Sequence, residues 1–121
     1  DSGAPIFIQK GGIKALSMYG EDGSAPKAVE DNMKIYAERR KAIVDGFRKL
    51  GFDVKMPKGT FYVWFDCGMP SMKFTEKLID CGVVVTPGSG FGKSVGNYAR
   101  VAVTQSLDRI EEAFDRIEKV L

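Results

Sequence analysis

The chain has 121 residues, of which 44% are hydrophobic and 28% are charged, a composition typical of one globular domain with a single core. Eighteen basic against sixteen acidic residues leave a net charge of +2, which does not indicate nucleic acid or a membrane surface as a partner. The apolar runs are shorter than a membrane-spanning helix requires, and no signal-peptide pattern opens the chain.

The first half of the chain predicts two helices joined by a linker. A short, mostly helical run is expected over residues 6–19, followed by the turn-rich stretch "GEDGSAP". A long helix is predicted over 26–50, with Pro26 at its first helical position and apolar residues recurring every three or four positions. Gly51 ends this helix, as a glycine after the last helical residue often does.

The second half predicts strands and two further helices. Strands rich in β-branched and aromatic residues are expected at four places: near 52–55 and over 60–67, 83–87 and 97–105. A short helix is expected over 71–80, where Ser71 could act as the cap, and a strongly amphipathic helix over 107–121. The order of elements predicts an α+β fold, a small, largely antiparallel sheet of about four strands with helices packed against it.

The residue inventory limits the chemistry of the chain. It contains no histidine, the commonest general base and the commonest metal ligand. Cys67 and Cys81 have no further cysteine or histidine beside them, so no metal site is expected. Both are interpreted as reduced core thiols, which favours a cytoplasmic protein. The chain begins at Asp1 without a methionine, which suggests a piece of something longer.

The segment "VVVTPGSGFGKS", residues 83–94, ends in Gly-Lys-Ser as a nucleotide-binding P-loop does. A P-loop requires a further glycine five positions before Gly92, but Pro87 stands there and has no N–H to offer a phosphate. The residues that follow alternate as a strand, whereas a P-loop leads into a helix. We therefore expect a structural turn here, with no nucleotide bound at Lys93.

One charged residue interrupts the predicted strand over 97–105. Alternation puts Arg100 on the face opposite Ala99 and Val101, and both faces are apolar enough for a strand covered on both sides. Burying a lone cation is costly unless an anion meets it. Two interpretations stay open: an edge-strand arginine that reaches water or pairs with a carboxylate such as Asp66, or a planar guanidinium that awaits a carboxylate ligand.

Five segments occur together in this sequence: "DSG" followed closely by Ile8-Gln9, "RRKAIVDGFRKLGF", "PKGTFYVWF", "GVVVTPGSGFG" and "NYARVAVTQSLDRIEEAFDRI". In this order and at this spacing they resemble the C-terminal small domain of the class I and II aminotransferases, pyridoxal-phosphate enzymes of fold type I. The chain is most similar to the branch with LL-diaminopimelate aminotransferase and the aspartate-type enzymes. The resemblance implies that residues 1–121 form one small domain of a larger enzyme, with residues 1–24 joining it to an absent large domain.

The resemblance also implies roles for individual residues. Arg100 matches the arginine that binds the α-carboxylate of the amino-acid substrate. Phe61 matches an aromatic residue that lines the cleft, although a core role is an equal alternative. Tyr62 and Trp64 are interpreted as core residues, and Phe91 as the anchor of a loop whose glycines serve turn geometry.

The resemblance places the catalytic machinery outside this chain. The family's catalytic lysine lies in an upstream "SK" motif that is absent here, so no catalytic, cofactor-binding or metal-binding residue is assigned. The parent enzyme would use pyridoxal 5'-phosphate to transfer an amino group from an amino acid to a 2-oxo acid, with LL-diaminopimelate and 2-oxoglutarate as one candidate pair in lysine biosynthesis. It would be a cytoplasmic homodimer, and this chain alone would be inactive. The alternative is a free-standing, non-catalytic α+β module that uses Arg100 to bind a carboxylate effector.

Overall fold

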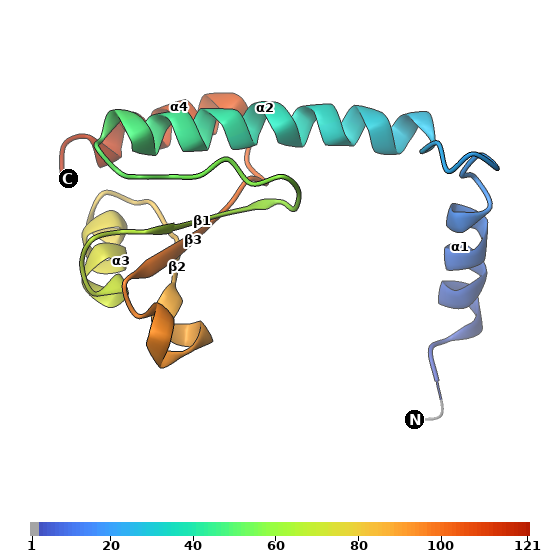
Figure 1. The fold of residues 1–121 in the computed structure, drawn as a ribbon, viewed down its shortest axis with the longest axis horizontal. Helices are drawn as coiled ribbons and strands as arrows, with labels where there is room; N and C mark the ends of the chain where they lie inside the picture. The colour runs from blue at the N-terminus through green and yellow to red at the C-terminus, as the bar shows by residue number, and fades with distance from the viewer. Residues whose placement is uncertain (1–2) are drawn as a thin grey trace. The chain divides into compact units, whose positions relative to one another are not determined.

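The computed structural model describes residues 3–121 and contains helices and a small antiparallel sheet, which confirms the predicted α+β class (Figure 1). The chain divides into two compact units, the first ending at Lys34 and the second comprising Ile35–Leu121. None of its helices combines the length and apolar character needed to cross a membrane. In chain order the elements are α1 (Ile6–Leu16), α2 (Lys27–Lys49), β1 (Tyr62–Asp66), α3 (Ser71–Asp80), β2 (Thr86–Pro87), the 3₁₀ turns η1 (Gly88–Phe91) and η2 (Lys93–Val95), β3 (Tyr98–Ala102) and α4 (Leu107–Ile117).

The sheet has three strands in the order β1-β3-β2, all antiparallel, so β3 lies in the centre. The predicted strand near 52–55 is wrong. The carbonyl of Val54 accepts a hydrogen bond from Nε of Arg48 at 2.8 Å, and the N–H of Val54 bonds to the carbonyl of Phe52 at 3.1 Å. The carbonyl of Val54 thus accepts from a helix side chain and its N–H donates within a local turn, so neither group pairs with a neighbouring strand.

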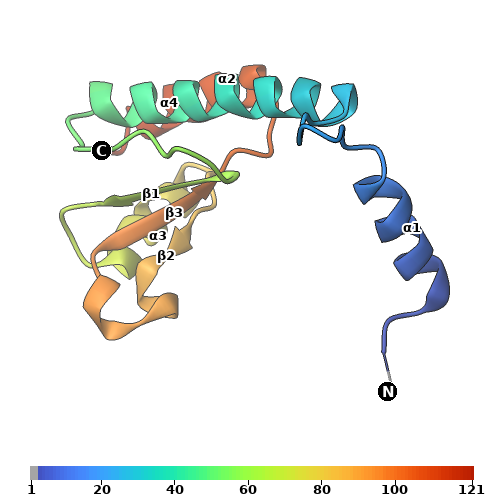
Figure 2. The same cartoon turned by 45° about the vertical axis from the view of Figure 1, so that its right-hand side comes forward.

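The core lies between the sheet and the helices of the second unit. Figure 2 shows α2 and α4 on one side of the sheet. Aromatic rings from these helices and from the sheet pack together in the space between them. The ring of Phe47 in α2 lies 4.5 Å from Phe65 of β1 and 5.0 Å from Phe114 of α4, centroid to centroid. Phe74 of α3 lies 6.0 Å from Phe65. Each fully buried phenylalanine stabilises the fold by about 1.5–3 kcal/mol, so this cluster anchors all three helices to one face.

The ends of the helices differ in detail from the sequence-based expectation. The N–H of Glu30 bonds to the carbonyl of Pro26 at 3.1 Å, so Pro26 precedes α2 and is not its first helical residue. Ser71, expected as the cap of α3, is instead its first helical residue, and Pro70 takes the capping position. In the first unit, α1 ends at Leu16 and buries none of its side chains.

Candidate functional site

The sheet has two unlike faces in the described part of the chain. Val63, Phe65 and Ala99 point into the core and are at most 2% exposed. The alternate residues of the same strands point the other way and are exposed or half-buried, among them Trp64 at 36%. The expectation of a strand covered on both sides is therefore wrong for this chain. The interpretation of Tyr62 and Trp64 as core residues is wrong too, because both lie on the open face.

Arg100 lies in the middle of this open face. It pairs with Trp64 of β1 on one side and Thr86 of β2 on the other, so it does not lie on an edge strand. Its Cζ is 4.2 Å from the centroid of the Tyr62 ring and 4.6 Å from that of Phe91. Cation–π contacts of this kind contribute about 0.5–2 kcal/mol each. Two aromatic rings from different elements thus flank the guanidinium.

No carboxylate neutralises Arg100 within residues 3–121. The ion pairs of these residues involve other arginines and lysines, all on helices. Oδ1 of Asp66, the carboxylate suggested as a partner, instead accepts the N–H of Gly68 at 2.8 Å. Nε of Arg100 is buried and has no hydrogen-bond partner. A planar cation with aromatic neighbours and free donors is suited to bind a carboxylate in its own plane.

The loop after β2 places Phe91 against this face, and two local contacts hold the loop in position. Gly88 is buried, and a Cβ there would collide with the carbonyl oxygens of Val95 and Tyr98, so only glycine fits. The N–H of Ser89 bonds to Oγ of Ser71 at 3.2 Å, which ties the loop to α3. The sequence led us to expect glycines with positive φ in this loop; Gly92 has one, at +149°, whereas Gly88 serves close backbone approach.

Phe61 stands next to this arrangement. The Phe61 ring lies 4.3 Å from the Tyr62 ring, centroid to centroid, and the residue is 44% exposed. The guanidinium of Arg100 lies over that Tyr62 ring. The preceding residue, Thr60, has φ of +66°, which is rare for a β-branched side chain and costs energy. Nη1 of Arg40 bonds to the Thr60 carbonyl at 3.2 Å and supports this backbone conformation. The exposure of Phe61 favours a place on a surface over a place in the core.

Sequence reasoning missed Tyr62 and Phe91 as neighbours of the guanidinium. The signal for Tyr62 was present in the two-residue alternation of β1, where Val63 and Phe65 fill the core and the residues between them must point outward. Phe91 gave no such signal, because its place depends on how the loop folds back.

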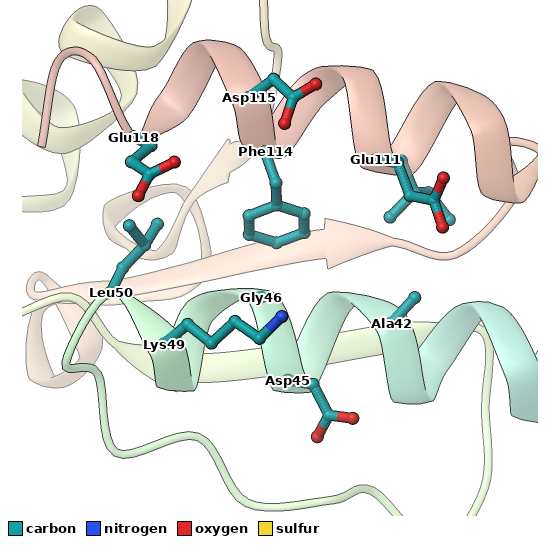
Figure 3. Close-up of a pocket in the computed structure, with 10 residues that line it drawn as sticks. Ala42, Asp45, Gly46, Lys49, Leu50, Glu111, Phe114, Asp115 and Glu118 are labelled. Carbon is teal, nitrogen blue, oxygen red and sulfur yellow. The ribbon is translucent and has the colours of Figure 1, made fainter.

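A furrow of about 390 Å³ lies between α2 and α4, and Arg100 is not among the residues that line it (Figure 3). Phe114 packs against Gly46 so closely that a Cβ on Gly46 would overlap the ring. The rim carries Lys49 and the carboxylates Asp45, Glu111, Asp115 and Glu118. A hydrogen bond from Lys41 lowers the pKa of Asp45. We interpret this furrow as the groove between two packed helices, with solvent-exposed charges along its rim.

Comparison with known proteins gives a consistent set of relatives. The family described as Aminotransferase class I and II matches residues 5–117. LL-diaminopimelate aminotransferase of Moorella thermoacetica is 39% identical over 100% of this chain, and aspartate aminotransferase of Pyrococcus abyssi is 40% identical over 95%. In both cases the chain spans 30% of the relative's length.

Solved structures show the same fold. The aromatic aminotransferase from Pyrococcus horikoshii OT3 matches 95% of this chain and 31% of its own, with a TM-score of 0.81 and 37% identity. The aspartate aminotransferase from Thermus thermophilus with maleate matches 77% of this chain and 25% of its own, with a TM-score of 0.70 and 30% identity. The similarity thus covers about a third or less of each neighbour.

Proposed function

Since this chain belongs to the class I and II aminotransferase family, we propose that it is the C-terminal small domain of a pyridoxal-phosphate-dependent aminotransferase, in which Arg100 binds the α-carboxylate of the substrates. The observation that carries the proposal is the environment of Arg100. It lies at the centre of an open sheet face, between two aromatic rings, without an anionic partner in residues 3–121.

The residues of this chain do not fit the cofactor itself. The family's cofactor attaches to a lysine, and every lysine in residues 3–121 is solvent-exposed, none of them on β1, β2 or β3 beside Arg100. The open face offers one cation and several aromatic rings, which suit a carboxylate. We place the catalytic lysine and the phosphate site in the part of the enzyme outside this sequence, where the bound cofactor acts as the electron sink of amino transfer.

The contribution of this chain is orientation. The guanidinium of Arg100 donates two parallel N–H bonds to the substrate carboxylate, which fixes the position of the adjacent Cα. The rings of Tyr62 and Phe91 flank the guanidinium and shield part of it from water, which strengthens its ion pair with the carboxylate, and Phe61 lines the cleft beside Tyr62. Residues 1–24, which include the helix α1, are proposed to join this domain to the large domain, so that the two can close over the substrate.

For the whole enzyme we propose transfer from LL-diaminopimelate to 2-oxoglutarate, in lysine biosynthesis, by a cytoplasmic homodimer. The names of the relatives support LL-diaminopimelate as the amino donor and also leave L-aspartate as a donor, whereas the acceptor 2-oxoglutarate is part of the proposal alone. The test is amino transfer by the full-length protein, measured with LL-diaminopimelate, L-aspartate and a primary amine that lacks the α-carboxylate. Loss of the preference for amino acids over the simple amine in an Arg100→Lys variant would support the role of Arg100. An unchanged preference would refute it.

A further inference from the structure

We propose that Phe91 is a positioning residue for carboxylate binding, because its ring holds the guanidinium of Arg100 in the orientation that the substrate requires. The inference rests on the proposed role of Arg100 and extends it to a loop residue. The sequence predicted only that Phe91 anchors its own loop. In the structure the Phe91 ring instead lies against two side chains of the open face, Arg100 and Trp64.

The contacts of Arg100 show why it needs such support. It has no ion pair within residues 3–121, and its buried Nε has no hydrogen-bond partner. The rings of Tyr62 at 4.2 Å and Phe91 at 4.6 Å are therefore what restrains its planar end group. A guanidinium stacked on aromatic faces keeps its N–H donors in its plane and free, which is the direction from which a carboxylate binds with two bonds. Restraint before binding lowers the entropy lost on binding.

Phe91 differs from Tyr62 in how it reaches the guanidinium. Tyr62 belongs to β1, whereas Phe91 is the last residue of the 3₁₀ turn η1. Two contacts already fix that turn without the ring: the close approach at Gly88 and the hydrogen bond between Ser89 and Ser71. The Phe91 side chain is 52% exposed, so core packing does not account for it. Its ring meets Trp64 edge to face at 5.5 Å, which sets the angle at which it covers Arg100.

The experiment uses the full-length aminotransferase with the single changes Phe91→Leu and Phe91→Tyr. The probes are maleate, for equilibrium binding, and 2-oxoglutarate, for steady-state kinetics. We expect Phe91→Leu to weaken maleate binding and to raise the KM for the oxo acid, each by about 2- to 30-fold, the range that a lost cation–π contact represents. The kcat should change little, because ground state and transition state lose the contact equally. Phe91→Tyr keeps an aromatic face and should restore wild-type values.

The matched control is Ile79→Ala on α3. Ile79 is 51% exposed, close to the 52% of Phe91, but it lies on α3 and not on the strands or the loop around Arg100, so its truncation should leave the Kd for maleate unchanged. The Tm of each variant is measured alongside. Where Phe91→Leu lowers the Tm, Phe91→Met replaces it as a flexible, non-aromatic side chain of similar volume, with the same expected rise in Kd.

A double-mutant cycle separates this inference from the proposed function. If Phe91 acts through Arg100, then Phe91→Leu should cause no further loss of kcat/KM in an Arg100→Gln background. A full additional loss there would mean that Phe91 contacts the substrate directly, and would overturn the inference. A wild-type Kd in Phe91→Leu, together with weakened binding in Arg100→Lys, would overturn the inference alone. Wild-type binding in Arg100→Lys would overturn the proposed function.

Discussion

The two faces of the strands β1 and β3 differ in burial and in proposed role: the inner face packs into the core, and the outer face is proposed to bind substrate. On β1, Val63 and Phe65 lie in the core and are 0% and 2% exposed, whereas Trp64 between them is 36% exposed. On β3, Ala99 is fully buried, and its neighbour Arg100 lies on the open face. A shift of one residue thus separates side chains that hold the fold from side chains proposed to bind substrate. The comparison predicts that changes on the inner face alter stability, and that changes on the outer face alter binding.

The largest effect is expected on the inner face. Phe65→Ala removes a ring that packs against Phe47 and Phe74 and leaves a cavity between the sheet and the helices. We expect the free energy of unfolding of this chain to fall by about 3–5 kcal/mol, measured by urea denaturation. Trp64→Ala on the outer face of the same strand is the control. If it destabilised the chain as much as Phe65→Ala, the contrast between the two faces would not hold.

The next effect concerns Arg100 in the full-length enzyme. Arg100→Lys keeps the charge but loses the planar fork with two donors toward the carboxylate. Loss of one partner in such a pair costs about 2–5 kcal/mol, so kcat/KM for amino acids should fall between about 30-fold and a few thousandfold. Cofactor content should stay at the wild-type level, because Arg100 is not proposed to touch the cofactor. A near wild-type kcat/KM would return Arg100 to the role of an ordinary sheet residue.

A smaller effect tests the burial of Cys67, a core residue just after β1. Cys67 follows β1, and its thiol donates to the carbonyl of Asn97 at 2.8 Å. Burial raises the pKa of the Cys67 thiol, so less of the reactive thiolate is present at a given pH. We expect iodoacetamide to modify the half-buried Cys81 faster than Cys67 under mildly alkaline conditions, measured by mass spectrometry of the folded chain. Faster modification of Cys67 would contradict its place in the core.

The raised pKa of Cys67 also makes the stability of the chain depend on pH. The folded thiol of Cys67 binds its proton more tightly than the unfolded thiol does, whose pKa is about 8.5. The contribution of Cys67 is therefore complete below that pH and is lost as the pH rises through the folded pKa. A Cys67→Ala variant should show a weaker loss of stability between neutral and alkaline pH than the wild type.

The smallest effect is expected in the loop after β2. Lys93 is exposed in the 3₁₀ turn η2, and the chain continues into β3 without the helix that a phosphate-binding loop requires. Lys93→Ala should change the free energy of unfolding by less than about 0.5 kcal/mol. Addition of Mg²⁺ with ATP should leave the Tm of the wild type unchanged. Saturable nucleotide binding that disappears in Lys93→Ala would refute the structural role of this loop.

Local pattern was enough to predict most of the fold. The apolar spacing of α2 and α4, the β-branched and aromatic residues of β1 and β3, and the α+β order are all properties of neighbouring residues. The strand near 52–55 was predicted wrongly for the same reason. Its residues favour extended backbone, but the hydrogen bond from Arg48 to Val54 satisfies that backbone from a helix, and no sequence pattern shows such a partner.

The candidate site divides in the same way. The sequence alone indicated a cation at position 100 within a strand and, through the resemblance, a family that uses an arginine there. It also argued against a P-loop, because Pro87 occupies the position of a required glycine. Only the tertiary structure decided that β3 is the central strand, that one face of the sheet is open, and that Tyr62 and Phe91 flank the guanidinium. Contacts between residues far apart in the chain depend on strand order and loop closure, which the periodicity of a single segment does not encode.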